Sequence, residues 1–197
     1  MIDLIVLAGG RGVRLGGRDK AALVVGGRTL LERVLDAAPG LGGTAVVVGA
    51  TSEPVPAGTL STVEDPPDGG PVAGIEAGLN ALDLEPGATR APWVAVVAVD
   101  QPRAAAALAQ LREHVDLVPG QVDALAHLHP EGAVQWLLGI YRRDRLRWAL
   151  HSLPRTRDIA VRQLVADLRW LLIATDGEDL GDVDTPADLA HWQHRTP

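Results

Sequence analysis

A stretch near the N-terminus combines closely spaced glycines with cationic side chains, and this combination is typical of phosphate-binding loops. Five glycines fall between positions 9 and 17, and a backbone without side chains lets successive N–H groups approach an anion. Arg11, Arg14, Arg18 and Lys20 add four positive charges within ten residues of a chain whose formal net charge is −7. The spacing fits neither the Walker loop nor the Rossmann glycine pattern. The stretch predicts a polyphosphate site, and the alternative is a flexible loop with solvated arginines.

Lys20 is the only lysine of the chain, whereas seventeen residues are arginine. An ammonium is a compact charge on a flexible stem and a guanidinium is a planar fork, so the two are not interchangeable at every site. Composition alone leaves open whether an ammonium is required here or one lysine is present by chance. Its position at the end of the glycine-rich stretch favours a role at the phosphates.

Carboxylates follow two of the apolar segments. Asp100 comes directly after the apolar run Trp93–Val99, and Asp65 follows a weaker apolar segment just before a glycine-rich turn. A carboxylate at the carboxyl end of a buried strand points into the crevice where α/β proteins bind ligands. Its oxygens are hard ligands that suit Mg²⁺. The alternative for each aspartate is a cap of the helix that follows.

The elements that must position these residues alternate along the chain. Apolar, β-branched runs predict strands at Ile2–Leu7, Ala45–Val48, Trp93–Val99, Trp136–Tyr141 and Leu168–Ala174, and more weakly at Thr59–Val63 and Val122–Ala126. Apolar residues at helical spacing predict helices over Thr29–Ala38, Val72–Leu82, Ala104–Val115, Asp144–Leu153, Asp158–Val165 and Pro186–His194. Before the last helix, Thr185 is expected as the N-cap, with Asp188 where a capping box places an acid.

Alternating strands and helices, with strands that are apolar throughout, predict an α/β fold with a Rossmann-like, mostly parallel sheet and helices on both faces. The length of 197 residues and the absence of a long linker predict a single domain over residues 1–197. Ligands of such sheets bind beyond the carboxyl ends of the strands. We therefore expect the chemistry in the loops that follow Leu7, Val48, Val63 and Val99.

Composition argues against several other classes of protein. The chain has no cysteine, which excludes disulfides, a thiol nucleophile and cysteine-ligated metal sites. The negative net charge argues against nucleic acid as a partner. The longest apolar run, Trp93–Val99, is too short to span a membrane, and the N-terminus lacks the pattern of a signal peptide. A cytoplasmic protein is therefore expected, and the absence of a G-x-S-x-G motif argues against a serine hydrolase.

The glycine-rich stretch resembles the signature L-A-G-G-x-S-x-R-M-G-x-D-K of the MobA-like nucleotidyltransferases, with matches at Leu7, Ala8, Gly9, Gly10, Arg14, Gly16, Asp19 and Lys20. It departs at Gly12, where serine is usual, at Leu15, where methionine is usual, and in the extra residue of the Gly16–Gly17 pair. The resemblance implies a fold like that of the nucleotide-diphospho-sugar transferases. It also implies that Leu7, Ala8, Gly9 and Gly10 bind the nucleotide around its base, and that Arg14 and Lys20 hold its phosphates.

Three further blocks carry the same resemblance. The segment from Asp65 to Leu79 is similar to the family element that lines the base and ribose pocket, which implies nucleotide contacts for Asp65 and Gly74. The sequence Asp100-Gln101-Pro102 resembles the element whose aspartate binds the metal. Near the end, Asp182 and Asp184 stand where the family usually has asparagines. Either of these two acids could make a second metal contact, or Asp184 could only support the cap of the last helix.

The resemblance implies an enzyme that transfers GMP from GTP to the molybdopterin cofactor with release of pyrophosphate, using Mg²⁺. Lys20, Arg14 and Asp100 would be its catalytic residues, and molybdoenzymes or cofactor-delivery proteins its possible partners. One alternative is a molybdopterin cytidylyltransferase or similar enzyme of the same fold, which Gly9 and the G-P-x-A-G block disfavour. The other is a nucleotide-binding protein without catalysis, against which Lys20, Asp65 and Asp100 argue. The arginines between positions 142 and 147 are expected either to be solvated or to receive a phosphorylated acceptor.

Overall fold

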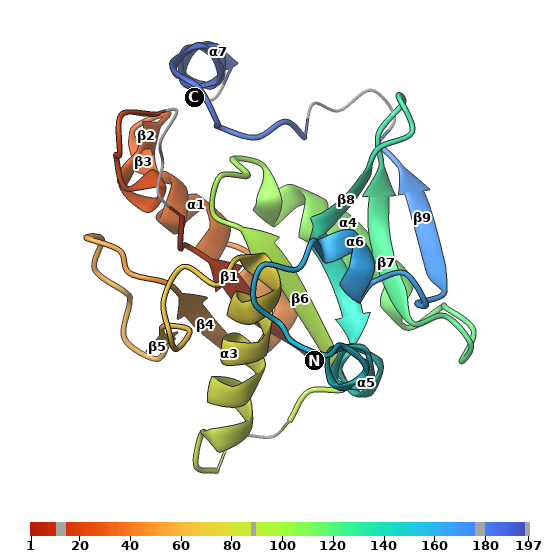
Figure 1. The fold of residues 1–197 in the computed structure, drawn as a ribbon. Coiled ribbons are helices and arrows are strands. Elements are labelled where there is room, and N and C mark those ends of the chain that lie inside the picture. The colour runs from red at the N-terminus through yellow and green to blue at the C-terminus, as the bar shows by residue number, and fades with distance from the viewer. Residues whose placement is uncertain (11–14, 88–89, 176–179, 196–197) are drawn as a thin grey trace.

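The computed structural model describes residues 1–10, 15–87, 90–175 and 180–195, and it is organised around one seven-stranded sheet (Figure 1). In spatial order the strands are β5 (Leu60–Thr62), β4 (Gly42–Val48), β1 (Ile2–Leu7), β6 (Trp93–Ala98), β8 (Val134–Arg142), β7 (Ala124–Leu128) and β9 (Trp170–Ala174). β1 pairs in parallel with β4 and β6, and β4 does so with β5. The predicted mostly parallel α/β sheet is therefore confirmed.

One strand departs from this direction, because β8 is antiparallel to both of its neighbours, β6 and β7. Only residues 129–133 separate β7 from β8. A connection this short can close a hairpin but cannot carry the chain back for a parallel crossover, which needs a dozen or more residues. All the other strands run in one direction, so the carboxyl ends of β1, β4 and β6 lie at the same edge of the sheet. We call this the carboxyl edge, and the opposite edge the amino edge.

Helices cover both faces of the sheet, as the alternation of strands and helices predicts. One face packs against α1 (Leu30–Leu35), α2 (Ala38–Leu41) and α4 (Ala104–Val115), and the other against α3 (Pro71–Leu84), α5 (Arg143–Ser152) and α6 (Val161–Leu164). Within β1, Leu4 and Val6 belong to the first core while Ile5 and Leu7 belong to the second. Successive side chains of a strand point to opposite faces, so β1 contributes to both cores, as its neighbours β4 and β6 also do.

Two predicted helices differ from the observed elements. The range Thr29–Ala38 contains α1 and the start of a separate short helix, α2, and α1 begins with a capping box between Thr29 and Glu32. In the range Asp158–Val165 the helix α6 begins only at Val161. Asp158 has a φ of 55°, and a residue in the left-handed region cannot start a right-handed helix. The other four predicted helices are present within two residues of their expected ends.

A small hairpin between β2 (Val24–Val25) and β3 (Arg28–Thr29) has no counterpart among the predicted strands. Gly26 and Gly27 form its turn, with φ values of 54° and 74°, as a two-residue hairpin turn with positive φ at both positions requires. The C-terminal helix α7 (Pro186–Arg195) contacts β2. Its predicted cap is confirmed, because the Thr185 N–H donates to Asp188 Oδ2 at 2.8 Å and the Asp188 N–H donates to Thr185 Oγ1 at 3.2 Å.

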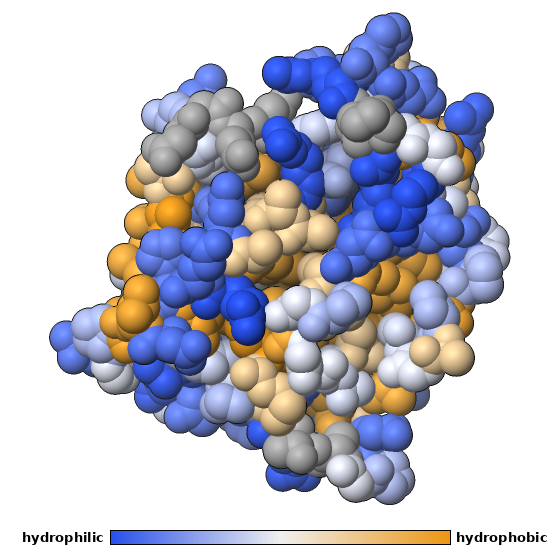
Figure 2. Space-filling model, turned by 180° about the vertical axis from the view of Figure 1, so that it is seen from behind, coloured by the Kyte–Doolittle hydropathy of each residue, from blue (hydrophilic) through white to orange (hydrophobic). Residues whose placement is uncertain are grey.

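Across the described ranges, no helix is both long and apolar enough to cross a membrane. Seen from behind, the molecule carries hydrophobic and hydrophilic side chains interspersed rather than one continuous apolar face (Figure 2). Exposed large apolar side chains such as Leu84, Leu117 and Trp148 belong to three different segments of the chain.

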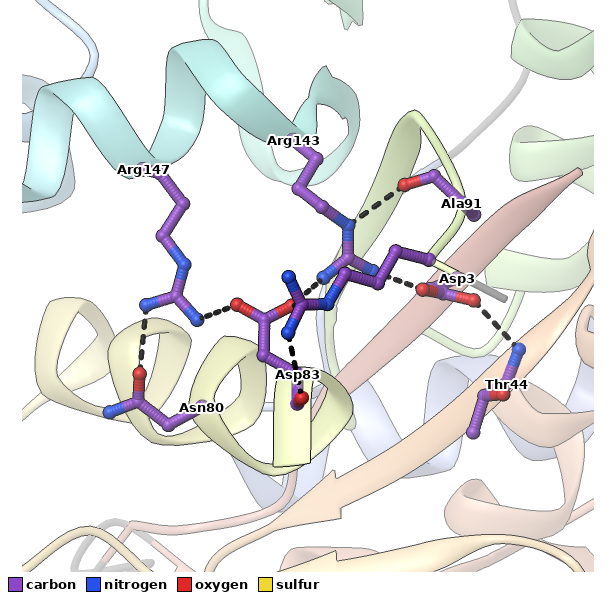
Figure 3. Close-up of polar contacts among 8 residues, drawn as sticks. Asp3, Thr44, Asn80, Asp83, Ala91, Arg143 and Arg147 are labelled. Carbon is purple, nitrogen blue, oxygen red and sulfur yellow. Dashed lines mark hydrogen bonds and ion pairs between the residues drawn. The ribbon is translucent and has the colours of Figure 1, made fainter. Parts of the chain in front are cut away.

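At the amino edge, a network of ion pairs joins α5 to α3 and β1 (Figure 3). Arg143 pairs with Asp3 and, at 2.6 Å, with Asp83 Oδ1. Arg147 pairs with Asp83 Oδ2 at 2.5 Å and donates to Asn80 Oδ1 at 2.8 Å. We call these five residues the amino-edge network. It shows that Arg143, whose side chain is only 11% exposed, neither lies on a solvated face nor reaches an acceptor at the opposite edge.

Candidate active site

A cavity of about 730 Å³ opens at the carboxyl edge of the sheet. Its walls come from the ends of β1, β4 and β6, from the first turns of α3, and from the segments that contain Lys20 and Asp184. The sequence predicts the chemistry in four loops, and a residue at the start of each one lines this cavity. These residues are Leu7, Val48, Glu64 and Asp100. A volume of this size is in the range of small-molecule sites.

The residues that follow β1 and β4 lie close together beside the cavity, with their backbones in contact. The N–H groups of Ala8 and Gly9 donate to the carbonyl oxygen of Val48 at 2.8 and 3.2 Å. Gly49 has a φ of 112°, and a Cβ at this position would lie 2.3 Å from the Gly9 nitrogen. Gly49 is therefore required by this close approach. The sequence analysis did not single it out, although a glycine directly after a predicted strand was a usable signal.

Gly74 fits helix α3 closely against the two strands. A Cβ at position 74 would lie 3.0 Å from Leu7 Cδ2 and 3.7 Å from Val48 Cγ1. The absence of a side chain thus brings the first turns of α3 to the cavity, where Gly70, Pro71 and Gly74 line the wall. Helix N-termini present unpaired N–H groups and a partial positive charge. This wall can therefore accept polar or anionic parts of a ligand.

Lys20 is presented by the short 3₁₀ helix η2 (Lys20–Ala22), which Asp19 caps through the Ala21 N–H at 2.9 Å. The other carboxylate oxygen of Asp19 accepts from Thr51 Oγ1 at 2.9 Å and from the Ser52 N–H at 2.6 Å. Burial opposes ionisation of Asp19, but hydrogen bonds from Ser52, Thr51 and Ala21 outweigh it and lower the pKa of the carboxyl. Asp19 therefore ties the segment of Lys20 to the loop after β4, one of the four loops in which the sequence predicts the chemistry.

The ammonium of Lys20 lies between two carboxylates. Its Nζ is 2.6 Å from Asp100 Oδ2 and 2.5 Å from Asp184 Oδ1. Burial lowers the pKa of Lys20, but the hydrogen bonds and charges of Asp100 and Asp184 outweigh it and raise the pKa above its usual value. We call Lys20, Asp100 and Asp184 the lysine–carboxylate cluster. Asp184 also takes part in the cap of α7, because its N–H donates to Asp188 Oδ2 at 3.1 Å. The expected support of the cap is therefore observed, while a metal contact of Asp182 or Asp184 stays a prediction.

Asp182 stands next to this cluster but has a different partner. Its Oδ1 accepts from Gln101 Nε2 at 2.8 Å, and the Val183 N–H donates to the carbonyl oxygen of Asp100 at 2.9 Å. Burial first, and the negative charges of Asp100 and Asp184 second, raise the pKa of Asp182 to about 6. The segment that precedes α7 is thereby fastened to the end of β6. Gln101 is a further residue of the site that the sequence analysis quoted without a role.

The donor set of the cluster fits Mg²⁺. Magnesium usually takes one or two carboxylates from the protein and completes its shell with water and substrate phosphates. Asp100 and Asp184 supply two carboxylate oxygens that converge on one cation, the ammonium of Lys20. Within the described part of the chain there is no group of three or more potential metal ligands, and two are sufficient for a metal shared with phosphates.

Three of the predicted site residues are not among those that line the cavity. Ala8 is buried beside it, where its N–H donates to Val48. Arg14 lies outside the residues that the structure describes. Asp65 is exposed at the start of a glycine-containing turn, and the nearby acids that line the cavity are Glu64 and Asp68. The roles expected for Arg14 and Asp65 stay predictions, as do the specific contacts expected for Leu7, Ala8, Gly9, Gly10 and Gly74.

The sheet order and the position of the cavity define the fold of the protein as that of the nucleotide-diphospho-sugar transferases. The fold is shared with molybdopterin-guanine dinucleotide biosynthesis protein A from Archaeoglobus fulgidus (TM-score 0.67, 20% identity, 98% of each chain). It is also shared with 2-C-methyl-D-erythritol 4-phosphate cytidylyltransferase from Thermus thermophilus (TM-score 0.68, 21% identity, 98% of each chain).

Sequence comparison identifies the family. The chain belongs to the MobA-like NTP transferase domain family, whose model matches residues 4–171. It is 32% identical over 197 aligned positions to a molybdenum cofactor guanylyltransferase of Rhizobium meliloti, covering 94% of this chain and 87% of the relative. The family expected from the resemblance of the glycine-rich stretch is therefore confirmed.

Proposed function

We propose that the protein is a molybdenum cofactor guanylyltransferase, which transfers GMP from GTP to the molybdopterin cofactor and releases pyrophosphate. The observation that carries the proposal is the lysine–carboxylate cluster, which lies in the same cavity as the glycines that follow β1. Relatives of the chain are named molybdenum cofactor guanylyltransferases. In this reaction the terminal phosphate of the acceptor attacks the α-phosphorus of GTP. A new P–O bond forms, and the bond to the leaving pyrophosphate breaks.

Catalysis of this kind depends on positioning and on stabilisation of charge, because no covalent enzyme intermediate is needed. We assign the phosphates to Lys20, to Arg14 and to the backbone at Gly9 and Gly10. Asp100, with Asp184 beside it, would hold Mg²⁺. When bound, the metal would supply positive charge that offsets the negative charge developing on the phosphates.

We place the guanine and ribose over the apolar floor that Leu7, Ala8 and Gly74 border. Asp65 keeps its expected contact to the base or ribose as part of this proposal. The molybdopterin cofactor would enter from the open side of the cavity. We also propose a cytoplasmic enzyme that meets cofactor-delivery proteins or molybdoenzymes and that binds neither nucleic acid nor membranes.

The alternative within the same fold is a cytidylyltransferase, and the Thermus thermophilus neighbour is the observation that keeps it open. Calorimetry with Mg²⁺ and either GTP or CTP tests the choice of base, and tighter binding of CTP would overturn the guanine assignment. Release of pyrophosphate on addition of molybdopterin tests catalysis itself. A protein that binds GTP but releases no pyrophosphate would be a nucleotide-binding protein without transferase activity.

A further inference from the structure

The position of the Lys20 ammonium bears on how the nucleotide and its metal enter the site. We propose that this ammonium holds the cation position between Asp100 and Asp184 in the nucleotide-free protein, and that it leaves this position when a divalent cation binds. The inference rests on the proposed function in one respect only, namely that the ligand which binds together with the metal is a nucleoside triphosphate. It assigns to Asp184 the role of second carboxylate at the metal position.

The argument starts from the distances around one nitrogen. Lys20 Nζ is 2.6 Å from Asp100 Oδ2 and 2.5 Å from Asp184 Oδ1. Magnesium binds carboxylate oxygens at about 2.0–2.1 Å, so a metal held by these same two oxygens requires the space that the ammonium fills. Two cations at such a separation repel each other strongly. Occupation by the ammonium and by the metal is therefore mutually exclusive.

Charge favours the exchange. A divalent cation carries twice the charge of the ammonium, so the carboxylates of Asp100 and Asp184 attract it more strongly at this position. An aspartate at position 184 adds to this attraction, which an asparagine would not. Asp182 is less suited to the role, because its Oδ1 already accepts from Gln101 at 2.8 Å.

The fold holds Asp184 in place from two directions. It is 164 positions from Lys20 in the sequence, yet the hydrogen bond from the Val183 N–H to the Asp100 carbonyl fastens its segment to β6. On the other side, the Asp184 N–H is held by Asp188 in the cap of α7. The carboxylate can therefore stay in position while the ammonium leaves.

Lys20 also has a place to go. Its side chain lines the same cavity as Gly9 and Gly10, the backbone to which we assign the phosphates. The lysine stem is flexible, while Asp19 holds the backbone of η2 through Ala21, Thr51 and Ser52. The ammonium can thus move toward the phosphates without a change in the backbone.

The first test measures metal binding to the nucleotide-free protein, with Mn²⁺ as the probe and electron paramagnetic resonance as the readout. We expect Lys20→Met to bind Mn²⁺ at least about tenfold more tightly than the wild type, because the competing cation is gone. The gain should disappear in the double variant Lys20→Met/Asp184→Asn. The matched control Arg18→Met removes the same charge two residues away and should change the affinity less than about twofold.

Three results would overturn the proposal. Mn²⁺ affinity in Lys20→Met could be equal to or weaker than that of the wild type. Arg18→Met could show the same gain, which would make the effect one of general charge. The double variant could keep the gain, which would remove Asp184 from the metal position.

The second test uses the wild-type protein and needs no variant to fold. Because Lys20 is the only lysine, labelling lysine with ¹³C at Cε gives a single side-chain resonance. We expect Mg²⁺ alone to shift this resonance in a saturable way, at the concentrations at which Mg²⁺ displaces Mn²⁺ from the wild-type protein in an electron paramagnetic resonance competition. A resonance that stays unchanged while Mg²⁺ displaces Mn²⁺ would show that ammonium and metal coexist, and would overturn the proposal.

Neither test contains GTP or an acceptor, so their outcome is independent of guanylyl transfer. If the exchange is observed but no pyrophosphate is released from GTP and molybdopterin, the proposed function fails and the exchange stands. If guanylyl transfer is observed without the exchange of ammonium and metal, the proposed function stands and the exchange is overturned.

Discussion

At the amino edge of the sheet, Arg143 and Arg147 face Asp3 and Asp83, whereas at the carboxyl edge a single ammonium faces Asp100 and Asp184 with Asp182 beside them. In the amino-edge network each carboxylate has an arginine partner. At the carboxyl edge, the described residues place more negative charge than positive around an open cavity. A charge-balanced network suits a structural role, while an excess of carboxylates suits a site that receives cations.

Ionisation of aspartate differs between the two edges for the same reason. Asp123, at the amino edge beside the start of β7, has its pKa lowered mainly by hydrogen bonds from Arg169 and further by the charge of Arg145. Asp182, at the carboxyl edge, has its pKa raised to about 6 by burial and by the neighbouring carboxylates. The environment, and not the residue type, decides which form is stable.

The largest effect is expected at the amino edge. Arg143→Met leaves Asp3, which is 4% exposed in its side chain, without its ion-pair partner. Removing one member of a buried ion pair typically costs about 3–5 kcal/mol, so we expect a loss of this order in the free energy of unfolding by urea. Arg90→Met is the control, since Arg90 also pairs with Asp83 Oδ1, at 3.7 Å, but is 65% exposed and should cost less than about 1 kcal/mol. Equal losses in the two variants would contradict a special role for the amino-edge network.

At the carboxyl edge the expected loss is in turnover rather than in stability. Lys20→Ala should lower kcat/KM for GTP by about 10²–10³-fold, the usual effect of removing one preorganised charge at a reacting phosphate. The thermal midpoint should change by only a few degrees, measured by circular dichroism. Near-normal turnover would remove the phosphate role assigned to Lys20.

A smaller effect is expected from the residue that positions Lys20. Asp19→Asn keeps the shape of the side chain but replaces an ionised acceptor of the Thr51, Ser52 and Ala21 hydrogen bonds. Charge-assisted hydrogen bonds are about twice as strong as neutral ones, so we expect kcat/KM to fall by roughly tenfold. The ¹³Cε resonance of Lys20 should broaden or shift. An unchanged resonance and unchanged kinetics would limit Asp19 to a local cap.

The smallest effect concerns pH and the amino edge. Because the folded-state pKa of Asp123 is below its ordinary value of 3.8, its contribution to stability is complete above that value and is lost as the pH falls through the folded-state pKa. Arg169 is 57% exposed, so Arg169→Gln should cost less than about 1 kcal/mol at pH 7. Urea unfolding between pH 2 and 7 should show a weaker loss at the acid end in this variant. If the variant and the wild type lose the same free energy of unfolding at acid pH, then a partner other than Arg169 lowers the pKa of Asp123.

Much of the architecture was predictable from local patterns. Apolar runs located the strands of the sheet, and α4 has the predicted bounds. The hairpin of β2 and β3 was not predictable from apolar patterning because each strand has only two residues. The direction of β8 depends on the short connection between β7 and β8, and the late start of α6 follows from the backbone conformation of Asp158.

The sequence by itself determined the family and the position of the site. Glycines, a lone lysine and carboxylates at the ends of apolar runs are local features, and parallel strands must bring their carboxyl ends to one edge. Only the tertiary structure decided which of these groups meet. It joins Lys20 to Asp184 across 164 positions, directs Asp182 to Gln101, and places Glu64 and Asp68, with Asp65 exposed nearby, at the cavity wall. Such pairings depend on how the chain returns to the sheet after β9, and no local pattern encodes that return.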